Sequence, residues 1–207
     1  MFLAGGVGDV LDGIQSVVVS LAAGTAAWMA VLGVNAWRKQ MRGKTEYEIA
    51  RRCLRQTYRI RDSLRFVRSP MISSGEFAHA AKEQEDKPTT KPAERSKQDK
   101  MIAVYNERWR HVAEAHSDLM LDVLEAEVLW PKIRAASKPL SECIHDLNVD
   151  LSFYLREISG NRPRLSIERR EALDKAIFWQ GPDDPFEVKL RDAVQKMEDL
   201  LAPHVRA

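Results

Sequence analysis

The sequence predicts an all-α protein in which one N-terminal transmembrane helix precedes a helical bundle or coiled-coil-like domain, built on a long kinked heptad helix. Three observations lead to this prediction: an uncharged stretch over 13–37, apolar residues spaced three and four apart over 101–158, and capping signals before the other amphipathic segments. Of the 207 residues, 30% are charged and 44% hydrophobic, which is typical of a folded protein rather than a disordered one.

Charge is distributed unevenly along the chain, although the formal net charge is only +2. Residues 38–68 hold eleven Lys and Arg against three acidic residues, whereas 101–158 holds ten acidic residues against six basic ones. The cysteines, Cys53 and Cys143, each stand alone in a helical pattern without a CxxC pair. This predicts buried free thiols in a reducing compartment rather than a disulfide framework.

Residues 14–37 are predicted to form the transmembrane helix, because about 20 apolar residues cross a hydrocarbon core about 30 Å thick. A secretory signal peptide is the competing interpretation, but 1–13 contains no Lys or Arg, and its only charges are Asp9 and Asp12. The basic flank at 38–44 follows the span directly. By the positive-inside rule, we expect a single-pass protein of the inner (plasma) membrane, with a short N-terminus outside and the C-terminal domain in the cytoplasm.

Small residues form a stripe along the predicted span. Residues of this size let two membrane helices approach closely, so they are candidates for transmembrane self-association, although alanine is common in any span. The stripe consists of Ala22, Ala26, Ala30 and Gly33.

A second helix is predicted over 45–68. Gly43 interrupts the helical pattern, and Thr45 and Glu48 have the spacing of a capping box. Ser69-Pro70 is expected to end the helix. Its apolar face consists of Ile49, Ala50, Cys53, Leu54, Thr57, Ile60, Leu64 and Val67.

Arginines cover the opposite face of this helix, at Arg51, Arg52, Arg55 and Arg59. The simplest interpretation is a solvated face partly neutralised by acidic neighbours. The same residues are candidates for binding anionic lipid or a protein partner, since each basic residue near a membrane surface contributes about 1 kcal/mol. Nucleic acid is not expected as a partner, because no binding motif or aromatic platform accompanies them.

The next segment, 69–100, is predicted to be a flexible charged linker. A short helix is possible over 76–85, but 86–100 carries Pro88, Pro92 and many charges, with no apolar residue larger than Ala93. Such a sequence buries too little apolar surface to order itself.

The longest regular pattern runs over 101–158, the start of the helical domain at 101–207. Spacing of three and four residues over about eight heptads is typical of coiled coils and long bundles. Pro131 and Pro139 lie at outward positions and the register survives both, which favours one long kinked helix over two antiparallel helices. The inward positions are Ile102, Tyr105, Trp109, Val112, His116, Leu119, Val123, Ala126, Trp130, Ile133, Ser137, Leu140, Ile144, Leu147, Leu151, Tyr154 and Ile158.

Two shorter helices are predicted after the stop at 160–163. One covers 166–180. The other covers 185–202, with Asp184 as N-cap, Pro185 at the first helical position and Pro203 closing it. Its buried face is predicted to contain Phe186, Leu190, Val194, Met197 and Leu201.

The sequence offers little catalytic chemistry. Glu142 and His145 have a di-iron spacing, but the motif occurs once and points away from the apolar stripe, so both are predicted to be surface residues. His116 is predicted to be a hydrogen-bonded core histidine. We therefore expect no catalytic residues, no metal site and no cofactor. An acidic strip is predicted to complement the arginines, within the chain or between subunits; it consists of Glu114, Asp118, Asp122 and Glu125.

These features favour a membrane-anchored, non-enzymatic scaffold or adaptor that acts through self-association or a protein partner on the cytoplasmic side. A membrane-surface sensor that binds anionic lipid through its arginines is the first alternative. A spanin-like lysis protein with the reversed topology is the second.

Overall fold

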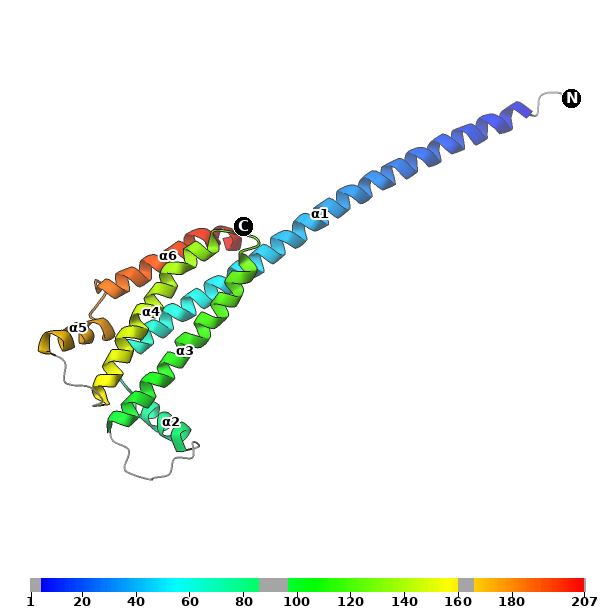
Figure 1. The fold of residues 1–207 in the computed structure, drawn as a ribbon. Helices are drawn as coiled ribbons and strands as arrows, with labels where there is room; N and C mark the ends of the chain where they lie inside the picture. Colours follow the sequence, from blue (N-terminus) through cyan, green and yellow to red (C-terminus); the bar gives the residue numbers. More distant parts are fainter. Residues whose placement is uncertain (1–4, 86–96, 160–165, 207) are drawn as a thin grey trace. The chain divides into compact units, whose positions relative to one another are not determined.

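The computed structural model describes residues 5–85, 97–159 and 166–206, and every regular element in these ranges is an α-helix (Figure 1). Within helices, the side chains at 5–20, 22–24, 26–27, 80–85 and 97 lie outside the description. The chain divides into two compact units, Met1–Tyr47 and Glu48–Ala207.

Helix α1 spans Gly5–Val67 and contributes to both units. The predicted break at Gly43 is therefore wrong, because a glycine costs only about 1 kcal/mol in a helix and its neighbours sustain the hydrogen-bond ladder. Thr45 does not cap a new helix either. Its Oγ1 donates a hydrogen bond to the carbonyl of Met41 one turn earlier, at 3.1 Å.

Among the residues that the structure describes, no helix combines the length and the apolar character needed to cross a membrane. Half of the side chains of the predicted span at 14–37 lie outside the described residues, including those of Ala22 and Ala26. Ala30 and Gly33 are exposed on α1. The predicted transmembrane helix and its stripe of small residues thus receive no support from the fold.

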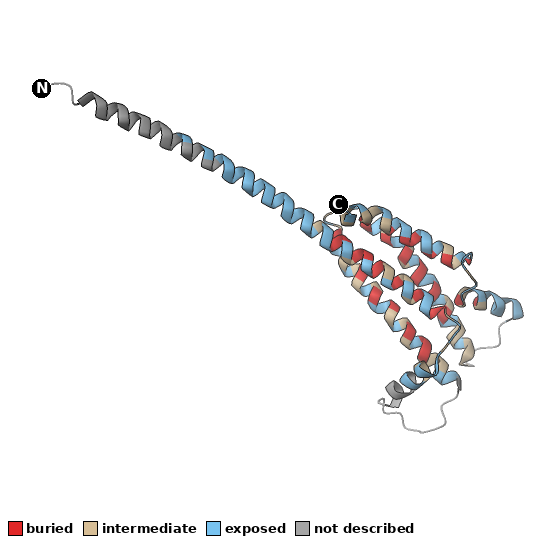
Figure 2. Ribbon diagram, turned by 180° about the vertical axis from the view of Figure 1, so that it is seen from behind, coloured by how far each residue is buried: buried red, intermediate tan, exposed pale blue. Residues whose placement is uncertain are grey.

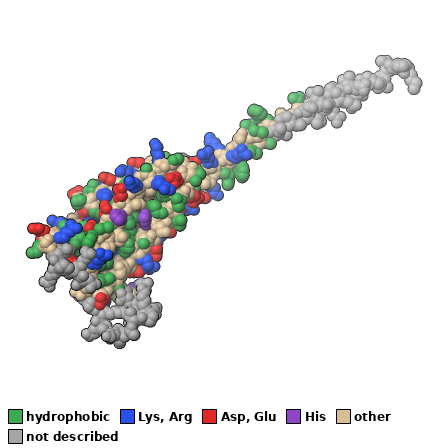
Figure 3. Space-filling model, viewed as in Figure 1, with side chains coloured by type: hydrophobic (Ala, Val, Ile, Leu, Met, Phe, Trp, Pro, Cys, Tyr) green, Lys and Arg blue, Asp and Glu red, His purple; other side chains and the backbone are tan. Residues whose placement is uncertain are grey.

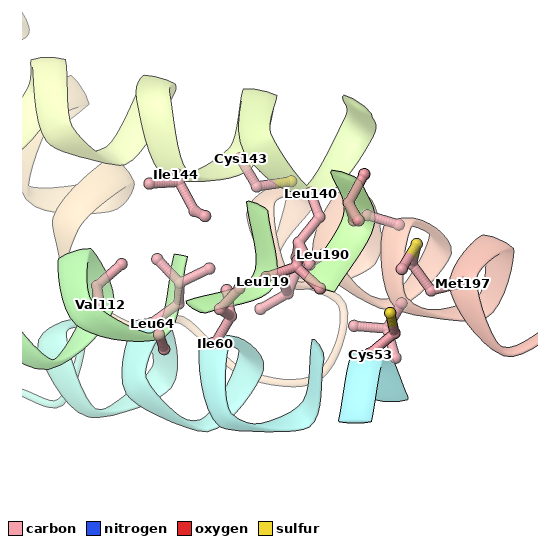
Figure 4. Packing of buried hydrophobic residues seen from close by; sticks show 14 of the residues in the cluster. Cys53, Ile60, Leu64, Val112, Leu119, Leu140, Cys143, Ile144, Leu190 and Met197 are labelled. Carbon is pink, nitrogen blue, oxygen red and sulfur yellow. The ribbon is translucent and has the colours of Figure 1, made fainter. Parts of the chain in front are cut away.

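In the second unit, residues 48–67 of α1 pack with α3 (Lys97–Ala126), α4 (Ile133–Ile158) and α6 (Pro185–Arg206) around one core. Successive helices of this four-helix bundle run in opposite directions, and the buried residues line their facing sides (Figures 1 and 2). The predicted apolar face of 45–68 is confirmed, since all eight of its residues are buried. Figure 4 shows Ile60 and Leu64 meeting Val112, Leu119, Leu140, Ile144 and Leu190 in this core.

The long heptad segment is a helical hairpin and not the kinked helix that we expected. Helix α3 ends at Ala126, residues 127–132 form turns, and α4 begins at Ile133. The amides of Leu129 and Trp130 bond to the carbonyl of Ala126, which tightens the end of α3. Pro131 has no N–H to continue the ladder. Every predicted inward position is nevertheless buried or half-buried, because the turn preserves the register on both sides.

Two short helices complete the described fold. Helix α2 (Ser74–Glu85) lies in the predicted linker, of which residues 86–96 are outside the description. Helix α5 (Ile167–Ile177) ends earlier than predicted because Phe178 is extended. Asp184 caps α6 as predicted, but the helix continues through Pro203 to Arg206, so the predicted closure at Pro203 is wrong.

Candidate functional site

The arginines of α1 and the acidic strip of α3 meet within the chain. The guanidinium of Arg59 lies 3.0 Å from Asp118 Oδ2 and 3.6 Å from Glu114 Oε2. Arg52 pairs with Asp122, at 3.5 Å, and with Glu125. The predicted charge complementarity is therefore intramolecular, and it aligns α1 antiparallel to α3.

The other two predicted arginines stand apart from this interface. Arg51 and Arg55 are exposed, and neither forms an ion pair with the part of the chain that the structure describes. Partial burial of Asp122 raises the pKa of its carboxyl despite the opposing effect of Arg52. Of the four candidate residues, Arg52 and Arg59 thus form partly exposed ion pairs with α3, and Arg51 and Arg55 face solvent.

A buried arginine holds one end of the bundle together. The side chain of Arg68 is 1% exposed and donates from Nη2 to Asp184 Oδ2 at 2.7 Å. It also donates to the carbonyls of Lys175, Ala176 and Phe178 at the C-terminal end of α5. Lys175 and Ala176 lie in the last turn of α5, where carbonyls lack partners within the helix, so the cation joins the ends of α1 and α5 to the start of α6.

Asp184 completes this cluster. Its Oδ1 accepts from the amides of Phe186 and Glu187, and its Oδ2 accepts from Arg68 and from the amide of Gln180. Burial opposes the charged form, but the bonds from Arg68 and from backbone amides outweigh it and lower the pKa of Asp184. The same carboxylate therefore caps α6 and neutralises the buried arginine.

Arg108 makes an equivalent cluster at the junction of α1, α2 and α3. It donates to Glu76 Oε1 at 2.7 Å and to the carbonyls of Phe66, Ser69 and Met71. Its guanidinium also lies over the ring of Phe66, 4.6 Å from the centroid. The bond from Arg108 is the main cause of a lowered pKa at Glu76.

Sequence patterns did not identify either buried arginine. Arg68 is one of many basic residues in the predicted helix at 45–68, and Arg108 occupies no distinctive position beside the stripe residue Trp109. Asp184 is the only residue of the two clusters that the sequence singles out. Its role as a helix cap is predicted, but its ion pair with Arg68 is not.

The chain matches no protein family, no curated protein and no solved structure.

His116 and the two cysteines are buried or half-buried in the bundle. His116 Nε2 lies 3.2 Å from Ser141 Oγ across α3 and α4, and burial lowers its pKa. Burial raises the pKa of Cys53 to about 12 and of Cys143 to about 11, so both thiols stay protonated at neutral pH. The predicted free, buried state of both cysteines is confirmed.

No metal centre emerges among the described side chains: no group of three or more His, Cys, Asp or Glu is arranged to hold an ion. Glu142 and His145 are exposed, as predicted for surface residues. Surface clefts of about 680, 500 and 450 Å³ lie at the end of the bundle that holds the two buried arginines.

Exposed apolar side chains gather elsewhere, at the C-terminal end of α3. Leu121 is 65% exposed and Leu124 is 56% exposed, about one turn later, and Val128 in the following turn is also exposed. The bundle also exposes single apolar side chains at other positions, such as Met71 and Ile167, and the face seen in Figure 3 mixes hydrophobic, basic and acidic side chains. This apolar surface, named here the α3 patch, consists of Leu121, Leu124 and Val128.

Proposed function

We propose that the protein is a non-enzymatic helical scaffold or adaptor that acts through self-association of its bundle. The observation that carries the proposal is the α3 patch, because an exposed cluster of large apolar side chains typically marks a binding surface. The heptad stripe cannot bind a second copy, since its residues are buried in the core of their own chain.

A second copy of the chain is the partner that fits the α3 patch best. A stripe on one helix face is self-complementary about a two-fold axis, which is the commonest symmetry of homo-oligomers. The flanking charges of α3, including Asp118 and Glu125, are already paired with α1. Association through the patch therefore does not bring unneutralised carboxylates from these positions together.

The proposal retains a membrane span over 14–37, with the N-terminus outside and the bundle in the cytoplasm. In support, α1 carries large exposed apolar side chains over its described part, among them Trp28, Met29, Val31, Leu32 and Trp37. Such a run is costly in water and is stabilised by lipid or by another helix. Reporter fusions at Met1 and at Ala207 test the orientation, and a protein that washes off membranes at high pH contradicts the span.

Chemical crosslinking of the whole chain in detergent micelles tests self-association. Wild-type protein is expected to give a crosslinked dimer, and the double variant Leu121→Gln and Leu124→Gln is expected to lose it. Val149→Gln, a change at an exposed apolar residue of α4, is the matched control. Equal crosslinking in the double variant and the control rejects the α3 patch.

Binding to anionic lipid is a second candidate function, now reduced to Arg51 and Arg55. These two arginines are exposed, whereas Arg52 and Arg59 are held by the acidic strip. Flotation with vesicles that contain phosphatidylserine is compared with flotation with neutral vesicles, because the difference reports charge-dependent binding and not insertion of the span. The variant Arg51→Gln plus Arg55→Gln is measured against a control pair at Arg134 and Arg156. Unchanged flotation of the first pair rejects this function.

A further inference from the structure

The cleft of about 450 Å³ beside the start of α6 has the composition of a small-molecule site. Its volume falls in the usual range for ligand pockets, about 300–1,000 Å³. Its walls combine Trp179, Pro70 and Pro182 with the charged side chains of Arg65, Glu187 and Arg191. An apolar wall with a few polar groups is the usual architecture of a site that both holds and orients a ligand.

Backbone hydrogen bonds fix the position of Trp179, which forms one wall of the cleft. The backbone amide of Trp179 donates to the carbonyl of Arg68 at 3.1 Å, and the next amide, of Gln180, donates to Asp184 Oδ2. Gly181 closes the turn with a φ of +123°. The indole itself is 51% exposed. A large aromatic side chain is thus presented to the cleft on a loop that the buried Arg68–Asp184 pair anchors.

A buried carboxylate beside this wall lacks part of its hydrogen bonding. Glu187 has a side chain that is 7% exposed, and its Oε1 accepts from Arg65 Nε at 2.9 Å and also from Nη2. Its Oε2 has no hydrogen-bond partner among the described residues. A buried acceptor of this kind favours a ligand that brings an N–H or amino donor.

The charges of the cleft favour an anion. Arg191 lies one helical turn after Glu187 on α6 and is exposed, whereas Arg65 is paired with that carboxylate. The two cations therefore exceed the single carboxylate by one positive charge. The indole supplies a face on which a planar ring can stack.

We propose that this cleft binds a planar, anionic small molecule with an N–H or amino donor on its ring, the chemistry of a nucleoside monophosphate. The ring stacks on Trp179, its donor edge meets Glu187 Oε2, and the phosphate pairs with Arg191. Because Oε2 is closed to solvent in the described conformation, entry of the donor requires a rotamer change in the cleft, which the long, half-exposed side chain of Arg65 permits. This inference does not depend on self-association.

Isothermal titration of the whole chain in detergent micelles with GMP, AMP and ribose 5-phosphate tests the site. Saturable binding of at least one nucleotide, and none of ribose 5-phosphate, is expected. Trp179→Ala is expected to weaken binding about tenfold or more through lost stacking. Trp179→Phe retains an aromatic face and is expected to bind more tightly than Trp179→Ala.

The charged wall is tested separately. Arg191→Gln is expected to weaken nucleotide binding and reduce its salt dependence. Arg156→Gln on α4 and Trp37→Ala on α1 are matched exposed controls and are expected to bind like wild type. The site is refuted if neither nucleotide shows saturable binding at concentrations up to about 5 mM. A concentration of this order is sufficient because weak small-molecule ligands bind with dissociation constants of about 1 mM. Equal affinity of Trp179→Ala and wild type refutes it as well.

Discussion

Arg68 and its partner Asp184 connect three helix ends through one buried ion pair. Such a pair is costly to break, because removing one partner leaves the other charged and desolvated. Arg108 is bound in a similar way, by an ion pair with Glu76 and by hydrogen bonds to three carbonyls from the end of α1 and the turn after it. The end of the bundle that carries the clefts is therefore organised by buried cations as well as by apolar packing.

Replacing Arg68 by Met is expected to lower the free energy of unfolding by about 3–5 kcal/mol, since Asp184 and the carbonyls at the end of α5 lose their donor. Arg51→Met on the same helix is the control and is expected to change it by less than about 0.5 kcal/mol, because Arg51 is exposed. Urea denaturation followed by circular dichroism measures both. Similar losses in the two variants would show that the buried pair has no special role.

Acid is expected to weaken the Arg68–Asp184 pair. The pKa of Asp184 is lower in the folded chain than its ordinary value of 3.8, so the pair stabilises the fold above that value. This contribution is lost as the pH falls below 3.8 through the lowered pKa. Asp184→Asn keeps a good helix cap but removes the charge.

The Asn variant is therefore expected to be less stable than wild type at neutral pH, and to lose less stability on going from about pH 5 to about pH 2.5. Melting temperatures at several pH values measure this. Parallel pH profiles for the two proteins would contradict the assignment.

At the scale of the elements, replacing a glycine by alanine is expected to have opposite effects on stability at Gly43 and at Gly181. Gly43 lies inside α1 with nothing within 4 Å of an added Cβ, so Gly43→Ala is expected to stabilise the helix locally by about 0.5–1 kcal/mol. Hydrogen exchange of the amides from Arg42 to Glu46 should slow by a corresponding amount. Faster exchange in Gly43→Ala than in wild type would instead support a helix break at Gly43.

Gly181 is the contrasting position. Its φ is +123°, and an added Cβ would again meet nothing within 4 Å. The strain in Gly181→Ala therefore comes from the backbone conformation and not from a steric clash. We expect a loss of about 1–2 kcal/mol in the free energy of unfolding, measured by urea denaturation. A neutral substitution would show that the turn before α6 relaxes.

The interface of α1 with α3 is expected to be specific but weak. Arg59 and Asp118 are both nearly half exposed, so a double-mutant cycle with Arg59→Ala and Asp118→Ala should give a coupling energy of about 0.2–1 kcal/mol. The coupling should fall in high salt. Zero coupling at low salt would mean that the charges do not align the two helices.

Periodicity predicted the inward face of every bundle helix, because a helix buries the same stripe whether it packs in a hairpin or in a long coiled coil. That equivalence is also why it mispredicted the hairpin, since the register of Trp130 and Ile133 is compatible with both. The break predicted at Gly43 is absent because a continuous helix tolerates one glycine at a cost of about 1 kcal/mol. The buried arginines escaped prediction because their partners are carbonyls contributed by distant helix ends.

For the whole molecule, the closed core has a functional consequence. Among the described residues, the heptad stripe is buried in the core and four acidic residues of α3 pair with Arg52 and Arg59, which leaves outer surfaces such as the α3 patch for the proposed association. The proposed adaptor function would therefore depend on exposed residues that contribute little to folding. Substitutions in the patch should separate assembly from stability.

Sedimentation velocity of the whole chain in density-matched detergent micelles tests self-association most directly. Wild-type protein is expected to shift from monomer to dimer as its concentration rises, and the Leu121→Gln and Leu124→Gln variant is expected to remain monomeric with an unchanged melting temperature. A wild-type protein that stays monomeric across the concentration range would contradict the proposed scaffold, as would a double variant that dimerises equally well.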